Sequence, residues 1–156
     1  MSDAMNNHHV VLYWDDVSVG DALPGFSMDL DWTTMALQVH GSQDWSRIHH
    51  DPDYARDSGH DDIFYNTGWT AGMLGRALTD WMGIQGWVRK LNFQMRGMNM
   101  NGDTVSAKGT VTDKRIDDEG RHLVDVDVWL ENDRVGKTTP ASAVVQLPAR
   151  SSERAG

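Results

Sequence analysis

Apolar residues recur at every fourth position across residues 66–82, and this spacing predicts the clearest helix of the chain. Asn66 or Thr67 is the expected N-cap, because such side chains accept hydrogen bonds from the first, otherwise unpaired N–H groups of a helix. The helix also contains glycines, each of which costs roughly 1 kcal/mol relative to alanine. We expect a sheet packed closely against the backbone to make them tolerable. The apolar stripe is Trp69, Met73, Ala77 and Trp81, and the glycines are Gly68, Gly72 and Gly75.

The period of the pattern changes to two after Gly86, which predicts strands whose alternate residues face a core. Polar turn segments at 101–103, 117–120 and 131–133 separate these strands. Pro140 has no N–H group, so it predicts a sheet edge or a bulge at the start of the last strand. The alternating sets are Leu91, Phe93 and Met95; Val105, Ala107, Gly109 and Val111; Val124, Val126, Val128 and Leu130; and Ala141, Ala143, Val145 and Leu147.

The first third of the chain has a weaker pattern. Residues 24–31 indicate a first strand, residues 33–41 a short helix that Thr33 caps, and residues 43–57 mostly loop. The order is then strand, helix, loop, long helix and four strands, and short turns between strands favour antiparallel neighbours. The economical packing of these elements is an α+β hotdog fold, in which a curved antiparallel sheet wraps around one long central helix.

Composition narrows the class of protein. The 156 residues suit one domain, which we expect over residues 10–147 with flexible tails at 1–9 and 148–156. The lack of cysteine excludes a disulfide framework, a thiolate nucleophile and a Cys-based zinc site. A net charge of −9 argues against nucleic-acid binding. No apolar run approaches the roughly 20 residues of a membrane helix, and the start does not resemble a secretory signal, so we expect a cytoplasmic protein.

The densest polar segment is residues 43–52, where Asp44 and His49 lie five positions apart. A carboxylate and an imidazole that converge on one water can carry general acid–base chemistry, because histidine titrates at about pH 6.5. The alternative is a metal site made of His49, His50 and Asp51. We favour it less, because adjacent ligands are awkward and no outlying third ligand is evident, and we expect no metal.

The same segment resembles the hydratase motif of the MaoC-like, (R)-specific enoyl-CoA hydratases, which reads approximately Ser-Gly-Asp-x-Asn-Pro-Ile/Leu-His followed by Asp-Pro. This chain has Ser42-Gln43-Asp44-Trp45-Ser46-Arg47-Ile48-His49 and then Asp51-Pro52. The resemblance implies a hotdog fold with Asp44 and His49 as the catalytic pair. The chain departs from the motif at Gln43, Ser46 and Arg47, which stand where the motif has Gly, Asn and Pro.

Residues 13–21 resemble the common entry to this family. Residues 62–67 and 79–81, together with the doubled His49-His50-Asp51, are similar to the small subunit of actinobacterial enoyl-CoA hydratases that act in steroid side-chain degradation. That resemblance implies hydration of a trans-2-enoyl-CoA, or the reverse dehydration, with CoA as part of the substrate and no other cofactor. It also implies a homo-oligomer or a hetero-oligomer with a second hotdog chain. The abundance of tryptophan and methionine, seven and nine residues, fits an apolar interface.

The resemblance also implies that amides at the start of the central helix bind the thioester oxygen. We therefore expect Tyr65, Asn66 and Thr67, together with Ser46, to contact the substrate, since the first N–H groups of a helix are unpaired and positively polarised. The alternative for Asn66 is a simple helix cap. Two other functions stay open, an acyl-CoA thioesterase of the same fold and a non-catalytic subunit that shapes a partner's acyl pocket. Three basic residues of the following strand could meet the CoA phosphates or line a solvated face: Arg89, Lys90 and Arg96.

Overall fold

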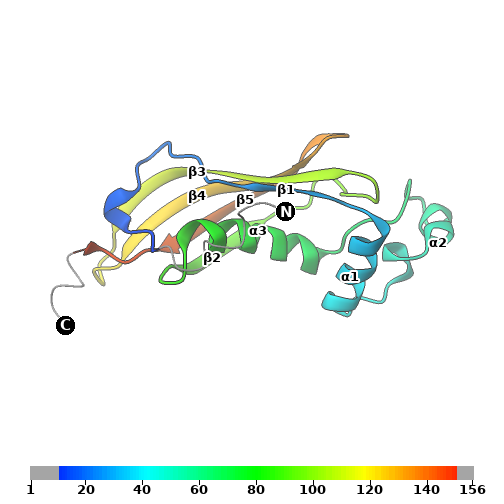
Figure 1. Cartoon of the computed structure of the whole chain (residues 1–156), viewed down its shortest axis with the longest axis horizontal. Coiled ribbons are helices and arrows are strands. Elements are labelled where there is room, and N and C mark those ends of the chain that lie inside the picture. The colour runs from blue at the N-terminus through cyan, green and yellow to red at the C-terminus, as the bar shows by residue number, and fades with distance from the viewer. Residues whose placement is uncertain (1–10, 151–156) are drawn as a thin grey trace.

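The computed structural model describes residues 11–150, and its main feature is one antiparallel sheet curved over one long helix (Figure 1). The predicted tail at 1–9 and the end of the second tail lie outside the described residues. In chain order the elements are η2 (Trp14–Asp16), β1 (Phe26–Asp29), α1 (Trp32–Ser42), η3 (Arg47–His49), α2 (Pro52–Asp57), α3 (Thr67–Met82), β2 (Trp87–Phe93), β3 (Thr104–Ile116), β4 (His122–Asn132) and β5 (Gly136–Gln146).

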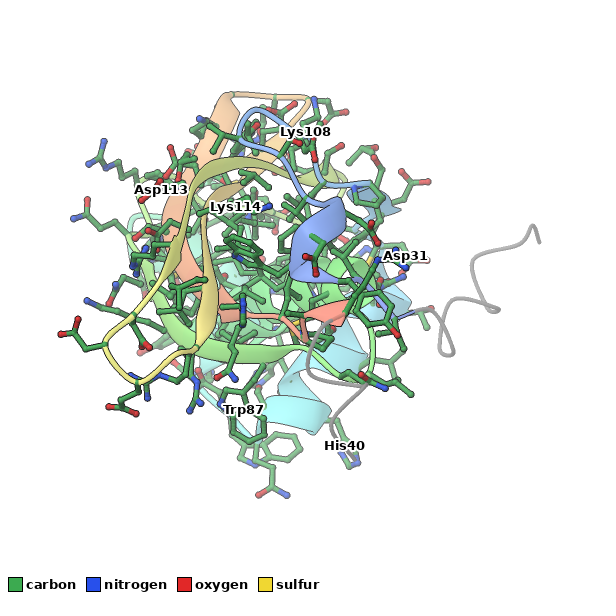
Figure 2. The ribbon with its side chains drawn as sticks, turned by 90° about the vertical axis from the view of Figure 1, so that its left-hand side faces the viewer. Asp31, His40, Trp87, Lys108, Asp113 and Lys114 are labelled. Atoms are coloured by element: carbon green, nitrogen blue, oxygen red, sulfur yellow. The ribbon has the colours of Figure 1, made fainter. Side chains whose placement is uncertain are left out.

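The sheet has the strand order β1-β3-β4-β5-β2, and every neighbouring pair is antiparallel. Alternate residues of β3, β4 and β5 are buried, as their period of two predicts. Figure 2 views the molecule from one end and shows the sheet curving around a filled interior, with the 64% exposed Trp87 on the outside. The predicted layout of a curved sheet around a central helix is therefore confirmed.

Helix α3 supplies the other half of the core. Leu74 and Leu78 are completely buried, and Ala77 is 2% exposed. Burying one leucine contributes about 1.5–3 kcal/mol. The expected reason for tolerating the glycines is wrong for two of them, because a Cβ atom at Gly72 or Gly75 would meet nothing within 4 Å. Burial of the opposite helix face therefore has to offset their low helix propensity.

Pro140 occupies an internal strand, since β5 lies between β4 and β2. The prediction of a sheet edge is therefore wrong, and the prediction of a bulge is correct. The β4–β5 register shifts between Leu130 and Glu131, next to the position where Trp129 faces Pro140. The proline has no N–H group to donate, but its carbonyl oxygen still accepts a hydrogen bond from the Gln94 N–H at 3.1 Å.

The structure corrects three local predictions. Helix α1 is capped by Asp31, whose Oδ1 accepts from the Thr34 N–H at 2.7 Å, and not by Thr33. Residues 52–57 were expected to be loop but form α2, because Asp51 caps a helix that begins with proline, a residue favoured at the first helical position.

The third correction concerns the C-terminal boundary. Residues 148–150 pack on the domain and are not a loose tail: the Pro148 carbonyl oxygen accepts from the Trp14 N–H at 2.8 Å, and Ala149 is buried. The Arg150 guanidinium pairs with Asp16. These contacts extend the packed domain beyond residue 147.

Candidate active site

The predicted catalytic pair lies between α1 and α2, beside the start of α3. Helix α1 ends at Ser42, and the next residue, Gln43, has a φ of 55°, in the left-handed region. That conformation suits glycine better than glutamine, which gives a physical reason for the glycine at this position of the hydratase motif. The sharp turn at Gln43 separates Asp44 from the helix and leads the chain into η3, which carries His49.

His49 is 6% exposed and held on two sides. Its ring packs edge-on against the ring of Phe64, with 4.9 Å between the ring centroids. Its Nδ1 lies 2.8 Å from the Phe64 carbonyl oxygen. A carbonyl oxygen can only accept, so Nδ1 carries the proton of this hydrogen bond. In the neutral imidazole Nε2 is then unprotonated, and its lone pair is available to act as a base.

Asp44 lies in front of that lone pair. Its Oδ2 is 3.4 Å from His49 Nε2, its Oδ1 accepts from the Ser46 N–H at 3.3 Å, and its side chain is 44% exposed. With the imidazole neutral, both facing atoms are acceptors, so they cannot bond directly to each other. A water molecule that donates one proton to each would satisfy both groups. The geometry is therefore suited to holding and polarising one water at the edge of the domain.

The start of α3 presents two free backbone donors next to this loop. Asn66 caps the helix, because its Oδ1 accepts from the Trp69 N–H at 2.8 Å, and its own N–H faces Gln38 Oε1 at 3.4 Å. Within residues 11–150 neither Thr67 nor Gly68 has an acceptor for its N–H group. These N–H groups belong to the positively polarised end of a 16-residue helix.

Ser42 joins the loop to the helix. Its hydroxyl donates to the Gln38 carbonyl oxygen at 2.6 Å and accepts from Asn66 Nδ2 at 2.5 Å. The Asp44 N–H lies 3.4 Å from the same hydroxyl. Ser42 belongs to the hydratase motif, but the sequence alone predicts no role for it or for Gly68. The backbone carbonyl of Phe64 was also missed, because no side-chain pattern marks it.

The four predicted substrate-binding residues differ in their surroundings. Tyr65 has little surface to offer a substrate: it is 1% exposed, its N–H donates to the Asn99 carbonyl oxygen, and burial raises the pKa of its hydroxyl. Asn66 is a buried cap whose side chain is already bonded on both sides. Thr67 retains a free N–H, and Ser46 is exposed with its N–H on Asp44. Of the four, Thr67 fits the predicted donor role best.

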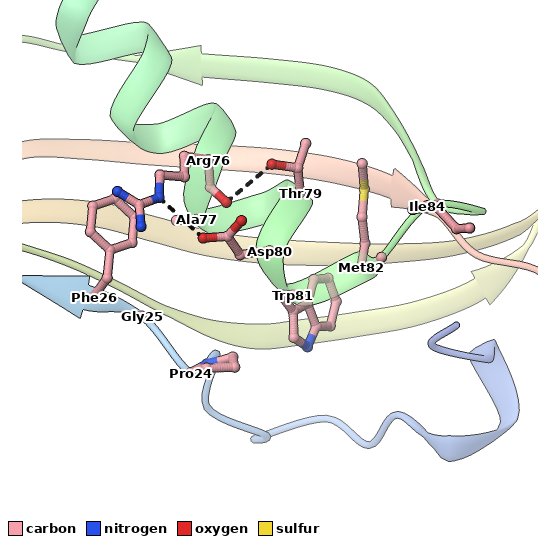
Figure 3. A pocket seen from close by; sticks show the side chains of 12 residues that line it. Pro24, Gly25, Phe26, Arg76, Ala77, Thr79, Asp80, Trp81, Met82 and Ile84 are labelled. Carbon is pink, nitrogen blue, oxygen red and sulfur yellow. Dashed lines mark hydrogen bonds and ion pairs between the residues drawn. The ribbon is translucent and has the colours of Figure 1, made fainter. Parts of the chain in front are cut away.

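Two cavities flank α3. One, of about 460 Å³, adjoins the candidate site, and its lining consists of Met28, Thr34, Leu37, Gln38, Gly41, Ser42, Gly68 and Trp69. The other, of about 400 Å³, lies at the C-terminal half of the helix, where the Arg76 guanidinium stacks on Phe26 and pairs with Asp80 (Figure 3). Arg76 follows Thr67 by nine residues, or about 14 Å along the helix, so the second cavity is separate from the predicted pair.

The alternative metal site finds little support in the geometry. His50 is exposed, and the Asp51 carboxylate pairs with the Arg47 guanidinium at 2.7 Å. That hydrogen bond lowers the pKa of Asp51. Across residues 11–150 the His, Asp and Glu side chains form no group of three that could hold a metal ion.

No helix within residues 11–150 has the length and apolar character needed to cross a membrane.

The basic residues proposed for CoA phosphates do not gather at one point. Arg89 donates to Gln146 at one end of β2, and Arg96 donates to Gln94 beyond the other end. Met95 is close to the start of α3, since its sulfur is 3.4 Å from the Thr67 hydroxyl. Arg96, the next residue along the chain, is therefore the one of the three nearest to the candidate site.

Comparison with known proteins identifies the family. The chain is 31% identical over 94 residues to the β subunit of a 3-oxo-4,17-pregnadiene-20-carboxyl-CoA hydratase from Mycobacterium tuberculosis, covering 60% of this chain and 73% of that protein. A chain of the ChsH1–ChsH2 complex from the same organism superposes with a TM-score of 0.75 at 27% identity, covering 84% of this chain and 98% of that one. The chain belongs to the MaoC-like hydratase family.

More distant structures agree on the fold. A MaoC-like dehydratase from Rhodospirillum rubrum superposes with a TM-score of 0.76 at 19% identity, covering 89% of this chain and 98% of that chain. An (R)-hydratase from A. caviae gives 0.75 at 19% identity, covering 85% and 98% of the two chains. No family model matches the sequence. The predicted hotdog fold is confirmed.

Proposed function

We propose that the chain catalyses hydration of a trans-2-enoyl-CoA to a 3-hydroxyacyl-CoA, or the reverse dehydration. One observation carries the proposal: Asp44 Oδ2 and His49 Nε2 lie 3.4 Å apart as two facing acceptors, with Nδ1 fixed on the Phe64 carbonyl oxygen. This arrangement can orient a single water and remove its proton. The named activity of the 31% identical relative, a CoA-ester hydratase, supports the same reaction class.

In the proposed reaction, the water oxygen forms a bond to the β-carbon of the enoyl thioester. His49 Nε2 accepts the proton that the water loses, while Asp44 holds the water and stabilises the resulting imidazolium. The electron pair of the C2–C3 double bond shifts toward the thioester, so negative charge collects on the carbonyl oxygen. The protonated pair then delivers a proton to the α-carbon, which completes the addition of water. No redox change occurs, so the scheme needs no cofactor beyond the CoA of the substrate.

The enolate oxygen requires donors that face it while its charge develops. The free N–H of Thr67, with that of Gly68 beside it, meets this need at the positive end of α3. Each such donor is worth about 2.7–4 kcal/mol in comparable oxyanion holes. The adjoining cavity of about 460 Å³, lined by Leu37 and Trp69 among others, is the proposed space for part of the acyl group.

The relatives also guide the choice of substrate and partner. Because one relative is a β subunit that acts on a polycyclic carboxyl-CoA, we propose a bulky acyl group of that kind as the first substrate to assay. Because a similar chain occurs in the ChsH1–ChsH2 complex, we propose that this protein associates with a second hotdog chain or with itself. An exposed edge such as β2 is a ready surface for pairing.

The test separates hydration from thioester hydrolysis. Enoyl absorbance should disappear without release of free CoA thiol, and both Asp44→Asn and His49→Gln should lower turnover by roughly 10²–10⁴-fold. His50→Gln is the matched control, since His50 is exposed beside the site and should keep wild-type activity. Near-normal hydration by either dyad variant would overturn the proposal. Stoichiometric thiol release from a saturated acyl-CoA would favour a thioesterase. If hydration needs an added partner and survives both substitutions, the chain is a non-catalytic subunit.

A further inference from the structure

A buried polar cluster behind the candidate site has no part in the proposed chemistry. Its centre is Asp103, whose side chain is 6% exposed and pairs with the Arg134 guanidinium at 2.9 Å. Asn132 is also buried and donates to Asp103 Oδ2 at 2.9 Å and to Asn99 Oδ1 at 3.1 Å. Burying a carboxylate is costly unless it is paired and hydrogen-bonded, so the cluster depends on Arg134.

The side chains of this cluster form hydrogen bonds with the backbone of residues 98–100. The Met98 carbonyl oxygen accepts from the Arg134 guanidinium at 2.9 Å and from the Asn132 amide at 3.3 Å. The Met100 N–H donates to Asp103 Oδ2 at 2.8 Å. Three side chains therefore fix a short segment that belongs to neither β2 nor β3.

That segment in turn aligns the backbone beside His49. Tyr65 N–H donates to the Asn99 carbonyl oxygen at 3.0 Å, and Phe64 forms an antiparallel bridge with Met100. The Phe64 C=O and the Tyr65 N–H belong to one planar trans peptide group, in which they point in opposite directions. Since the Tyr65 N–H points toward residue 99, the Phe64 carbonyl points away from it, toward the His49 ring, where it accepts from Nδ1 at 2.8 Å.

We propose that Arg134, acting with Asp103 and Asn132, is a positioning residue that fixes the tautomer and orientation of His49 through the Phe64 carbonyl. The inference rests on the proposed function, because it assigns a purpose to the unprotonated Nε2. Arg134 contacts neither the dyad nor the two free amides at the start of α3. If the segment at 98–100 shifts, the Nδ1 hydrogen bond weakens. The ring can then place its proton on Nε2, where it cannot act as a base.

The test replaces Arg134 by glutamine and uses Arg121→Gln as the matched control. Arg121 has a similar side-chain exposure, 35% against 38%, and also pairs with acidic groups, Asp117 and Glu119, at the opposite end of β4. Nitrogen NMR of ring-labelled histidine reports the tautomer of His49, assigned by the signal that is lost in His49→Gln. We expect Arg134→Gln to give a mixed tautomer and a kcat at least about tenfold lower, as small misplacements of catalytic groups do, with little change in KM.

Arg134→Lys, which keeps a charge beside Asp103, should restore part of the wild-type signal, and Arg121→Gln should leave it unchanged. A folded Arg134→Gln protein with the wild-type His49 signal and wild-type kcat would overturn the inference, as would the same signal change in Arg121→Gln. The NMR signal does not depend on turnover. Retained activity in His49→Gln would therefore remove the proposed function, whereas an unchanged tautomer in Arg134→Gln would remove only the positioning role.

Discussion

Replacing Thr67 by proline should remove one backbone donor at the start of α3 while leaving the helix intact. Thr67 is the first helical residue, where proline is favoured because the N–H has no helical acceptor. Asn66 precedes it with φ −80° and ψ 171°, the extended conformation that a residue before proline adopts. The substitution therefore deletes the N–H group and nothing else that the helix needs.

The size of the effect follows from the donors at this end. The N–H of Trp69 bonds the Asn66 side chain and that of Asn66 faces Gln38, so Thr67 and Gly68 supply the two free donors. Removing one oxyanion donor costs about 2.7–4 kcal/mol of transition-state stabilisation, or roughly 10²–10³ in kcat. The free energy of unfolding should change little, because no protein acceptor is lost and proline stiffens the unfolded chain by about 0.4–1 kcal/mol.

The assay compares Thr67→Pro with Thr67→Ala, which loses the side chain but keeps the N–H. Steady-state hydration should fall only in the proline variant, and chemical denaturation should give both proteins a free energy of unfolding close to that of the wild type. A kcat within about twofold of wild type in a folded Thr67→Pro protein would refute the donor role of Thr67. Equal losses in both variants would assign the effect to the side chain, which contacts Met95.

Two further predictions concern stability. Gly72→Ala should raise the free energy of unfolding by roughly 1 kcal/mol, because the added Cβ meets nothing within 4 Å, and a destabilised variant in chemical denaturation would contradict this. The pKa of Asp51 is lowered, chiefly by the hydrogen bond from Arg47 and then by that from the Tyr54 N–H, so its stabilising effect is present at neutral pH and is lost as pH falls below about 4. The free energy of unfolding of Asp51→Asn should therefore fall less between neutral pH and pH 3 than that of the wild type, because the contribution of one titrating carboxyl is missing. An unchanged slope of unfolding free energy against pH would contradict the assignment.

The strands and the long helix could be predicted from the sequence because each is a repeated pattern. The period of two along β4 and the period of four along α3 both extend over many residues, so single exceptions do not hide them. Shorter elements depend on one or two residues. Helix α2 was missed although Asp51 and Pro52 form a recognisable start, since six residues are too few to show a periodic face.

The candidate site was predictable only in part, for a related reason. Asp44 and His49 are side chains in one short motif, and the structure brings them to 3.4 Å. The hydrogen-bonding groups around them are mostly backbone atoms. The Phe64 carbonyl that orients His49, and the Thr67 N–H, are set by the path of the chain and could not be identified from residue type. The burial of Tyr65 could not be predicted either, because sequence proximity to the helix start does not say which way a side chain faces.

The proposed hydration needs two things at once: a base that accepts a proton from water near the β-carbon, and donors that stabilise the negative charge on the carbonyl oxygen. In the proposed mechanism the first task falls to a loop and the second to a helix end, so their separation has to match the length of an enoyl unit. Ser42 links the two, because its hydroxyl bonds Asn66 at the helix cap and lies 3.4 Å from the Asp44 nitrogen. The hydrogen bonds of Phe64 and Tyr65 link them a second time, since the Phe64 carbonyl accepts from His49 and the Tyr65 N–H donates to the segment that the Arg134 network holds. If the proposal is right, a substitution that leaves Asp44 and His49 in place can still lower turnover by changing the distance between the loop and the helix.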